Sequence, residues 1–269
     1  MSLFICPVCG GKLHIEEKSY ACEKGHRFDM AKQGYVNLLM SGGSSQKRHG
    51  DDKRMIRARR DFLNAGFYAP LLESAKELLS LYIKEENSAL DIGCGEAYYT
   101  AGLAEAFPKM RFAGIDISKD ALIYAKKRIP SLEAAVASGF RLPCADESFD
   151  LLIHFFAPLA EAEFCRVLKK GGWLLRAVPL EDHLYALKAL VYEKPYRNKP
   201  YQEEIEGFSL AAKREISYTM QLECEEDREN LFMMTPYYYK TGREDQEKLF
   251  SSGSLSVEAS FGLFLYQKI

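Results

Sequence analysis

Apolar runs and amphipathic segments alternate regularly from residue 88 onward. Short apolar runs bounded by turn residues predict strands, and the segments between them have helical spacing. The predicted strands are residues 89–92, 111–116, 134–137, 149–156 and 173–178. The predicted helices are residues 96–107, 118–128 and 160–168. This alternation indicates an α/β fold, with a doubly wound, mostly parallel sheet covered by helices on both faces.

The pattern is less regular on either side of this alternation. Before it, Pro70 fits the first turn of a helix that continues to about Tyr82. After it, we expect a helix, a polar and proline-interrupted insertion or lid, and two strands: residues 181–192, 193–213, 216–222 and 255–266.

Composition places the chain among globular proteins. Of its 269 residues 47% are hydrophobic, and no apolar run approaches the roughly 18 residues needed to cross a membrane. The first residues have neither the basic start nor the apolar core of a signal peptide, so we expect a cytoplasmic protein. Seven cysteines, an odd count, fit reduced thiols rather than a disulfide framework.

The net charge of −2 conceals an asymmetry along the chain. Residues 1–65 carry 12 Lys/Arg against 7 Asp/Glu, whereas the remainder carries 24 against 31. Seven of the basic residues fall between Lys47 and Arg60. Phosphate contact is one use for such a stretch, with Lys47, Arg48 and Lys53 as candidates, and a solvated helix face is the alternative.

The N-terminal segment has the ligand spacing of a zinc site. Cys6 and Cys9 form a Cys-x-x-Cys knuckle, and Cys22 and His26 follow with three residues between them. Three thiolates and one imidazole at these spacings fit a closed tetrahedral Zn²⁺ site. The alternatives are a redox pair, which should lie inside a βαβ unit, or chance. A module this small should depend on the metal for its stability.

A glycine-rich turn follows the first strand of the sheet. Asp91, Gly93 and Gly95 lie at its end, and the second strand ends at Asp116, where a carboxylate can accept bonds from ribose hydroxyls. A dinucleotide fingerprint requires a third glycine, but Tyr98 stands there, and Asp91 would repel a pyrophosphate. The turn suits a ligand with an ammonium group and no phosphate. It resembles motif I of the class I S-adenosylmethionine-dependent methyltransferases, and an ordinary glycine-cornered βα turn is the alternative.

Several motifs together resemble one family, the bacterial 23S rRNA (guanine-N1)-methyltransferases that modify a hairpin loop in domain II. They are the cysteine–histidine pattern with HRFDMAKQGYVNLL, then RARRDFLNAGFY, LDIGCGEAYYT, FAP and MTPYYY. The resemblance covers essentially the whole chain. It implies a zinc-binding module over residues 1–40, a basic linker and helical segment over 41–87, and a Rossmann-like S-adenosylmethionine-dependent methyltransferase domain over 88–269.

The resemblance also implies functional residues. The zinc ligands are expected to be Cys6, Cys9, Cys22 and His26. Expected contacts to the methyl donor are Tyr68, Gly95, Glu96 and His183. Its implied partner is a 23S rRNA hairpin loop, no membrane is expected, and a homodimer is an open option.

The sequence departs from many methyltransferases after the third strand. They carry an acid there for the adenine amino group, whereas this chain offers Ser138 and backbone. At the end of the fourth strand, Phe156 and Pro158 lie where this fold meets its acceptor. Phe156 is a candidate to stack on guanine, and a plain buried aromatic is the equal alternative. Two other functions stay open: a small-molecule methyltransferase, and a non-catalytic zinc-dependent RNA-binding protein.

Overall fold

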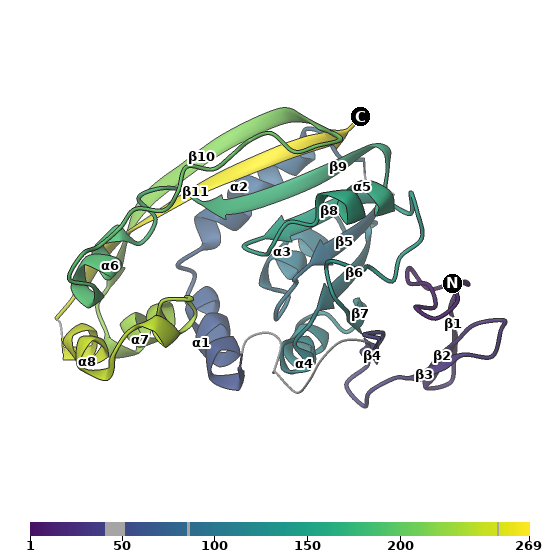
Figure 1. The fold of residues 1–269 in the computed structure, drawn as a ribbon, viewed down its shortest axis with the longest axis horizontal. Coiled ribbons are helices and arrows are strands. Elements are labelled where there is room, and N and C mark those ends of the chain that lie inside the picture. The colour runs from purple at the N-terminus through teal and green to yellow at the C-terminus, as the bar shows by residue number, and fades with distance from the viewer. Residues whose placement is uncertain (41–51, 85–86, 252) are drawn as a thin grey trace.

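The computed structural model describes residues 1–40, 52–84, 87–251 and 253–269. Two sheets are present in this part of the chain (Figure 1). The small N-terminal sheet has the order β1-β2-β3 and consists of His14–Glu16, Ser19–Ala21 and Arg27–Asp29. The large sheet has eight strands in the order β10-β11-β9-β8-β5-β6-β7-β4.

The centre of the large sheet is parallel, as the βα alternation predicts. Its parallel strands are β4 (Val36–Asn37), β5 (Ser88–Ile92), β6 (Arg111–Asp116), β7 (Glu133–Val136), β8 (Phe149–Phe155) and β9 (Leu168–Pro179). An antiparallel ribbon of β10 (Phe208–Leu222) and β11 (Leu255–Lys268) extends it beside β9. The order reverses beside β5, and ligands of open α/β sheets bind at such a switch point.

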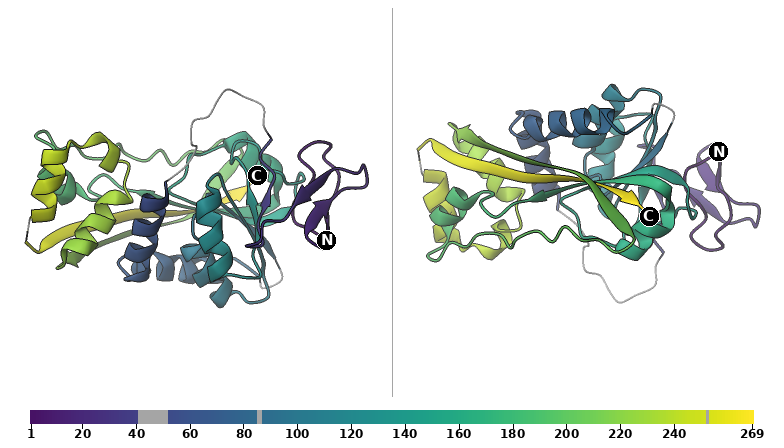
Figure 2. Two further views of the ribbon diagram at one scale, coloured as in Figure 1. Left: turned by 90° about the horizontal axis from the view of Figure 1, so that it is seen from below. Right: turned by 90° about the horizontal axis from the view of Figure 1, so that it is seen from above.

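Helices cover both faces of the sheet (Figure 2). They are α1 (Lys53–Asn64), α2 (Ala69–Ser80), α3 (Tyr98–Ala106), α4 (Lys119–Arg128) and α5 (Glu161–Val167). Local chemistry fixes their starts: the Asp52 side chain caps α1, Pro70 lies in the first turn of α2, and the Ser118 hydroxyl caps α4. The long β10–β11 ribbon carries α6 (Tyr185–Val191), α7 (Glu225–Met233), the 3-10 turn Tyr238–Lys240 and α8 (Arg243–Ser251) at the end opposite the N-terminal module (Figure 1).

Two apolar clusters lie on the two faces of the sheet. One packs Phe62, Leu71 and Leu103, from α1, α2 and α3, against the strands. The other joins Phe4 and Leu13 of the N-terminal module to Ile92, Ile115 and other residues of the sheet. The N-terminal module therefore shares its core with one face of the large sheet, and Val36–Asn37 pairs with β7 as its edge strand.

The structure corrects several predicted bounds. The helix expected over 181–192 is confined to α6, because His183 and Leu184 form a turn in which Leu184 has a positive φ. The insertion expected over 193–213 ends at residue 207, because β10 begins at Phe208 and pairs with β11 along its length. The strand expected from Trp173 begins at Leu168. Within the described residues, no helix is both long and apolar enough to cross a membrane.

Candidate active site

The four predicted zinc ligands lie together in the N-terminal module. Their donor atoms are all within 4.8 Å of one another. The Cys9 and Cys22 sulfurs are 3.7 Å apart, and the His26 Nδ1 atom lies 3.6 Å from the Cys6 sulfur and 3.3 Å from that of Cys22. Bond lengths of about 2.3 Å to sulfur and 2.0 Å to nitrogen give tetrahedral edges of about 3.5–3.8 Å. The donor set and its spacing therefore fit one structural Zn²⁺.

The glycine turn after β5 leaves open space above its backbone. Gly93 has φ +79°, and an added Cβ would lie 3.0 Å from the Ala157 Cβ. Gly95 has φ +57°, and an added Cβ would meet no atom within 4 Å. Glycine is needed at Gly93 for packing against the loop after β8 and at Gly95 for conformation. The space above Gly95 is open to a ligand.

Asp116 at the tip of β6 is held against this turn. Its Oδ2 accepts a hydrogen bond from the Gly95 N–H at 3.0 Å, and its Oδ1 accepts one from the Ser118 N–H at 2.7 Å. These two bonds orient the carboxylate beside the open space above Gly95. The geometry matches that of a ribose-binding acid.

Asp91 lies beneath the turn at the end of β5. It is 4% exposed, and its Oδ2 accepts a 2.5 Å hydrogen bond from the Thr100 hydroxyl on α3. Burial raises its pKa to about 7, and the nearby Asp116 charge acts in the same direction. A buried carboxylate with a raised pKa is poised to gain stabilisation from a cationic ligand group.

Glu96 adds a second buried carboxylate to the turn. It is 2% exposed, and neither of its carboxylate oxygens has an aligned hydrogen bond within the described residues. Its Oε2 lies 3.1 Å from Arg128 Nε at the end of α4, but that N–H donates to the Glu96 main-chain oxygen. Burial raises the pKa of Glu96, and the Arg128 charge opposes this. Oε2 is thus paired with the Arg128 charge, whereas Oε1 has no polar partner among the described residues and fits a site that a polar ligand completes.

Tyr68 and His183 are in contact beyond the carboxyl end of β9, although 115 positions separate them in the sequence. The His183 Nε2 atom lies 3.4 Å from the Tyr68 hydroxyl oxygen, and both side chains are buried. The Ser260 N–H donates to His183 Nδ1 at 3.2 Å. Burial lowers the pKa of His183 to about 3, helped by the Lys188 charge, so the ring is neutral and carries its proton on Nε2.

Phe156 lies at the mouth of this region. It is 44% exposed and has φ +57°, a conformation rare for a bulky residue. Its ring centroid lies 5.7 Å from that of Phe261, 6.3 Å from that of Tyr99 and 6.4 Å from that of Tyr68. The alternative of a plain buried aromatic is therefore wrong, because the ring is exposed at the edge of an aromatic cluster. Pro158 is also exposed.

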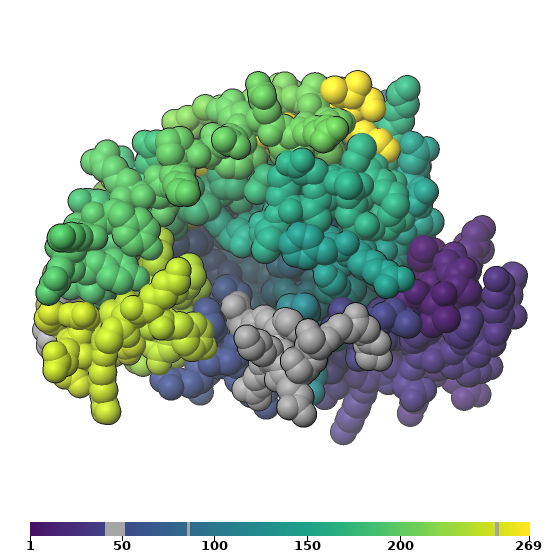
Figure 3. All heavy atoms as spheres, viewed as in Figure 1, coloured from purple at the N-terminus to yellow at the C-terminus, as the bar shows by residue number. Residues whose placement is uncertain are grey.

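The remaining predicted residues have different surroundings. The Ser138 hydroxyl accepts a hydrogen bond from the Phe140 N–H at 3.2 Å and so closes the turn after β7. Lys53, at the start of α1, lies 3.9 Å from Asp120, and its side chain is 73% exposed. Lys47 and Arg48 lie outside the described residues. A hollow borders α1, the α7–α8 end and the β8–β9 body in the space-filling view (Figure 3).

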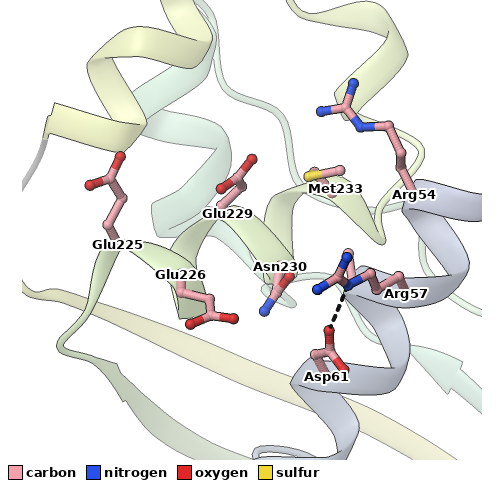
Figure 4. Close-up of a pocket in the computed structure, with 9 residues that line it drawn as sticks. Arg54, Arg57, Asp61, Glu225, Glu226, Glu229, Asn230 and Met233 are labelled. Atoms are coloured by element: carbon pink, nitrogen blue, oxygen red, sulfur yellow. Dashed lines mark ion pairs between the residues drawn. The ribbon is translucent and has the colours of Figure 1, made fainter.

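A separate open groove of about 530 Å³ lies between α1 and α7. Arg54 and Arg57 of α1 face Glu225, Glu226 and Glu229 of α7 across it (Figure 4). None of the predicted donor contacts lines this groove. It is therefore distinct from the site at the glycine turn.

Sequence reasoning missed three residues of the site. Thr100 binds Asp91, Arg128 pairs with Glu96, and the Tyr99 hydroxyl is buried without a hydrogen-bond partner among the described residues. Tyr99 and Thr100 follow the glycine turn directly, so their position in the first turn of the helix was an available signal. Arg128 is 32 residues from Glu96, and no sequence pattern joins them.

Comparisons with known proteins agree with this geometry. The family model described as RlmA, N-terminal, a zinc ribbon, matches residues 4–41, and the methyltransferase-domain model matches residues 89–172. Among solved structures, a chain in the complex between the Haloferax volcanii Trm112 methyltransferase activator and a methyltransferase superposes with a TM-score of 0.50. It is 18% identical, and the match covers 82% of this chain and 99% of that chain, which shows the shared fold.

Curated relatives are closer in sequence. The Bacillus subtilis (strain 168) protein YxjB, provisionally named a 23S rRNA (guanine-N(1)-)-methyltransferase, is 34% identical over 221 residues, which cover 78% of this chain and 77% of YxjB. The 23S rRNA (guanine(748)-N(1))-methyltransferase of Streptomyces fradiae is 35% identical over 185 residues, which cover 68% of this chain and 65% of that enzyme. With its zinc-ribbon ligands and its methyltransferase turn both in place, this chain belongs to the 23S rRNA (guanine-N1)-methyltransferase family.

Proposed function

We propose that this protein transfers a methyl group from S-adenosylmethionine to N1 of a guanine in a hairpin loop of 23S rRNA. The observation that carries the proposal is the Asp116 carboxylate, held by the Gly95 and Ser118 N–H groups beside open space. An aromatic cluster with one exposed ring lies across the same edge of the sheet. Family membership supplies the substrate class.

The methyl donor fits the residues around the glycine turn. We assign it the residues that line the carboxyl edge of β5, β6 and β7 together with the buried pair opposite: Tyr68, Asp91, Gly93, Gly95, Glu96, Asp116, Ser138 and His183. Bound there, S-adenosylmethionine supplies a methyl group on a sulfonium centre. Asp116 is placed to accept the ribose hydroxyls, and Asp91 and Glu96 supply the negative charge that an ammonium group requires.

The exposed Phe156 ring and Pro158 are assigned to the acceptor base. Guanine N1 lies on the Watson–Crick edge, so the base must be unpaired or turned out of its loop. Phe156 offers a stacking surface for it at the mouth of the site. In-line transfer then depends mainly on alignment of the two substrates.

Tyr68 and His183 have the wrong protonation to accept the N1 proton. The Nδ1 lone pair of His183 receives the Ser260 N–H, so Nε2 carries a proton and acts as a donor. Burial holds the pKa of Tyr68 well above its ordinary value, so its hydroxyl stays neutral. Their role is to hold and orient a ligand by donating hydrogen bonds.

The zinc module and the basic stretch are assigned to RNA capture in the cytoplasm. Lys47, Arg48 and Lys53 are the proposed phosphate contacts, since a net-negative body attracts RNA poorly by itself. Homodimer formation stays a prediction.

The test is transfer of labelled methyl groups to protein-free 23S rRNA, compared with a pool of small-molecule acceptors. We expect label in the rRNA, and a reverse-transcription stop one nucleotide before a loop guanine, because N1 methylation blocks pairing. Asp116→Ala is the control: at a donor concentration near the wild-type Kd, it should transfer less methyl to any acceptor. Labelling of the small-molecule pool alone would overturn the proposal and favour the small-molecule methyltransferase.

A further inference from the structure

A further pocket is bordered by Leu159, in the loop that follows β8 and carries Phe156. It has a volume of about 640 Å³, a size typical of small-ligand sites, and its lining comes from β9, the start of α5 and residues 198–204. Leu159, Val178, Pro179 and Pro200 form apolar walls, and Arg176 and Tyr201 contribute polar groups. None of the proposed donor-binding residues lines this pocket.

The Arg176 guanidinium is the principal unsatisfied group of this pocket. Its Nη1 donates to the Tyr201 hydroxyl at 3.1 Å, and its carbon lies 5.1 Å from the Tyr201 ring centroid. Its Nε is buried without a hydrogen-bond partner, and no carboxylate pairs with Arg176 in the described part of the chain. A guanidinium has five N–H donors in a planar fork. Because Nε is enclosed and one Nη1 hydrogen binds Tyr201, the N–H groups left for a ligand are those of Nη2 and the second hydrogen of Nη1, which have no hydrogen-bond partner within the described residues.

His154 links Arg176 of the pocket to the loop that carries Phe156. His154 lies beside Arg176 on the neighbouring strand and is fully buried. Its Nε2 lies 3.1 Å from the Pro158 main-chain oxygen, and its Nδ1 has no partner within the described residues. Burial and the Arg176 charge lower the pKa of His154 to about 4, so the neutral ring braces the loop without adding charge.

The charge balance of the pocket selects its ligand. Lys199 and Arg176 are offset by Glu161 and Glu204, which are exposed at the rim. A pocket with no net charge is a poor phosphate site. Guanine presents two adjacent acceptors, O6 and N7, that match an arginine fork, and its N1 and N2 hydrogens suit carboxylates. The prolines, Leu159 and Val178 offer apolar surface for a base, whereas the Tyr201 ring already packs against Arg176 and Phe264.

We propose that this pocket is a second base subsite, which receives a guanine of the RNA loop other than the methylated one. This inference rests on the proposed function. Phe156 at the acceptor site and Leu159 in the pocket are three residues apart, at most about 11 Å along the chain. A base in this pocket lies away from the glycine turn, so it contributes recognition rather than chemistry. Arg176 is therefore a specificity-determining residue.

The test is kinetic and uses the full-length protein. Wild type, Arg176→Lys and a control, Arg214→Lys, are compared on synthetic hairpins in which each loop nucleotide except the target is replaced in turn. Arg214 is a suitable control because it is half-buried on β10 and pairs with Glu77 of α2, on the opposite face of the sheet from the pocket. Lysine keeps the charge but loses the bidentate fork. S-adenosylmethionine affinity and thermal melting report whether each variant is folded.

We expect one guanine position at which replacement lowers wild-type kcat/KM by about 10- to 100-fold, the size of one bidentate arginine–guanine pair. Arg176→Lys should lose activity by a similar factor on the natural loop and show no further loss on the replaced loop. Arg214→Lys should behave as wild type. A second variant, Glu161→Ala with Glu204→Ala, removes both acceptors, alters only exposed side chains and should abolish discrimination between guanine and inosine at that position.

Three results would overturn the subsite. The first is a folded Arg176→Lys variant with wild-type kcat/KM and unchanged loop preference. The second is an equal loss on every loop together with a shallower salt dependence, which marks a phosphate contact. The third is unchanged guanine–inosine discrimination in the double alanine variant. Absence of rRNA methylation by the wild type would instead refute the proposed function, so the two failures are distinguishable.

Discussion

His183 Nε2 lies 3.4 Å from the hydroxyl oxygen of Tyr68, a residue 115 positions away in the sequence. The contact joins the turn after β9 to the start of α2 across the edge of the sheet. Because the Ser260 N–H occupies His183 Nδ1, the pair has a fixed direction, in which His183 donates to Tyr68. We propose that the Tyr68 hydroxyl in turn donates to the bound methyl donor.

We predict that Tyr68→Phe and His183→Phe each weaken S-adenosylmethionine binding by about 1–2 kcal/mol. The double variant should lose little more than either single one, since the residues act as a unit. Calorimetry measures the three affinities. Because the pKa of His183 is lowered to about 3, its charge should not change between pH 5 and 8. Fully additive losses would contradict the coupling.

Asp91 should make donor binding depend on pH near neutrality. Its pKa of about 7 means that it is increasingly protonated below pH 7, and a protonated carboxyl cannot pair with an ammonium group. Affinity should therefore be highest above pH 7 and fall as pH drops, approaching tenfold per unit well below it. Asp91→Asn should bind weakly at all pH values with a flatter profile. Titrations by fluorescence or calorimetry at pH 5.5–8.5 test this, and a flat wild-type profile would exclude the ion pair.

Asp116→Ala should weaken S-adenosylmethionine binding by about 1–3 kcal/mol, because the ribose hydroxyls lose their partner. Asp120→Ala is the matched control: Asp120 lies in the first turn of α4 and faces Lys53 rather than the glycine turn. It should leave donor affinity unchanged. Comparable loss in both variants would show a general charge effect, and tight binding of NADH would refute the choice of cofactor.

Cys9→Ser should lose the zinc ion and loosen the N-terminal module. The parallel sheet should keep its fold, because its second face has a separate core around α1–α3. Cys165→Ser, outside the four-ligand cluster, is the control. Metal analysis and hydrogen exchange provide the measurements. A metal-free wild-type protein with the same exchange rates would remove the structural role of zinc.

Replacement of Lys47, Arg48 and Lys53 by alanine should weaken RNA binding and flatten its salt dependence. Each lost phosphate contact should reduce the slope of log K against log salt by roughly 0.7–0.9. Affinity for S-adenosylmethionine should hardly change. Binding of the rRNA hairpin with wild-type affinity and slope would mean that this stretch is only a solvated surface.

Features that depend on local spacing were predictable from the amino-acid sequence. The zinc ligands were predictable because their spacings are typical of zinc knuckles, and the parallel sheet because each strand and helix has its own periodicity. The position of Asp116 was predictable because a βαβ unit places the end of its second strand, here β6, beside the turn that follows its first strand, here β5. Local reasoning was weaker where pairing partners are distant, as with the long β10 strand and the helices α7 and α8.

Contacts between side chains from distant parts of the chain depend on the three-dimensional fold. Tyr68, His183 and Ser260 come from three separate parts of the chain, and their contacts exist only because the antiparallel ribbon brings β11 beside β9. The pairing of Arg128 with Glu96 and the exposure of Phe156 likewise depend on packing between elements. Such contacts have no fixed spacing in sequence, so hydrophobic patterns and motifs carry no signal for them.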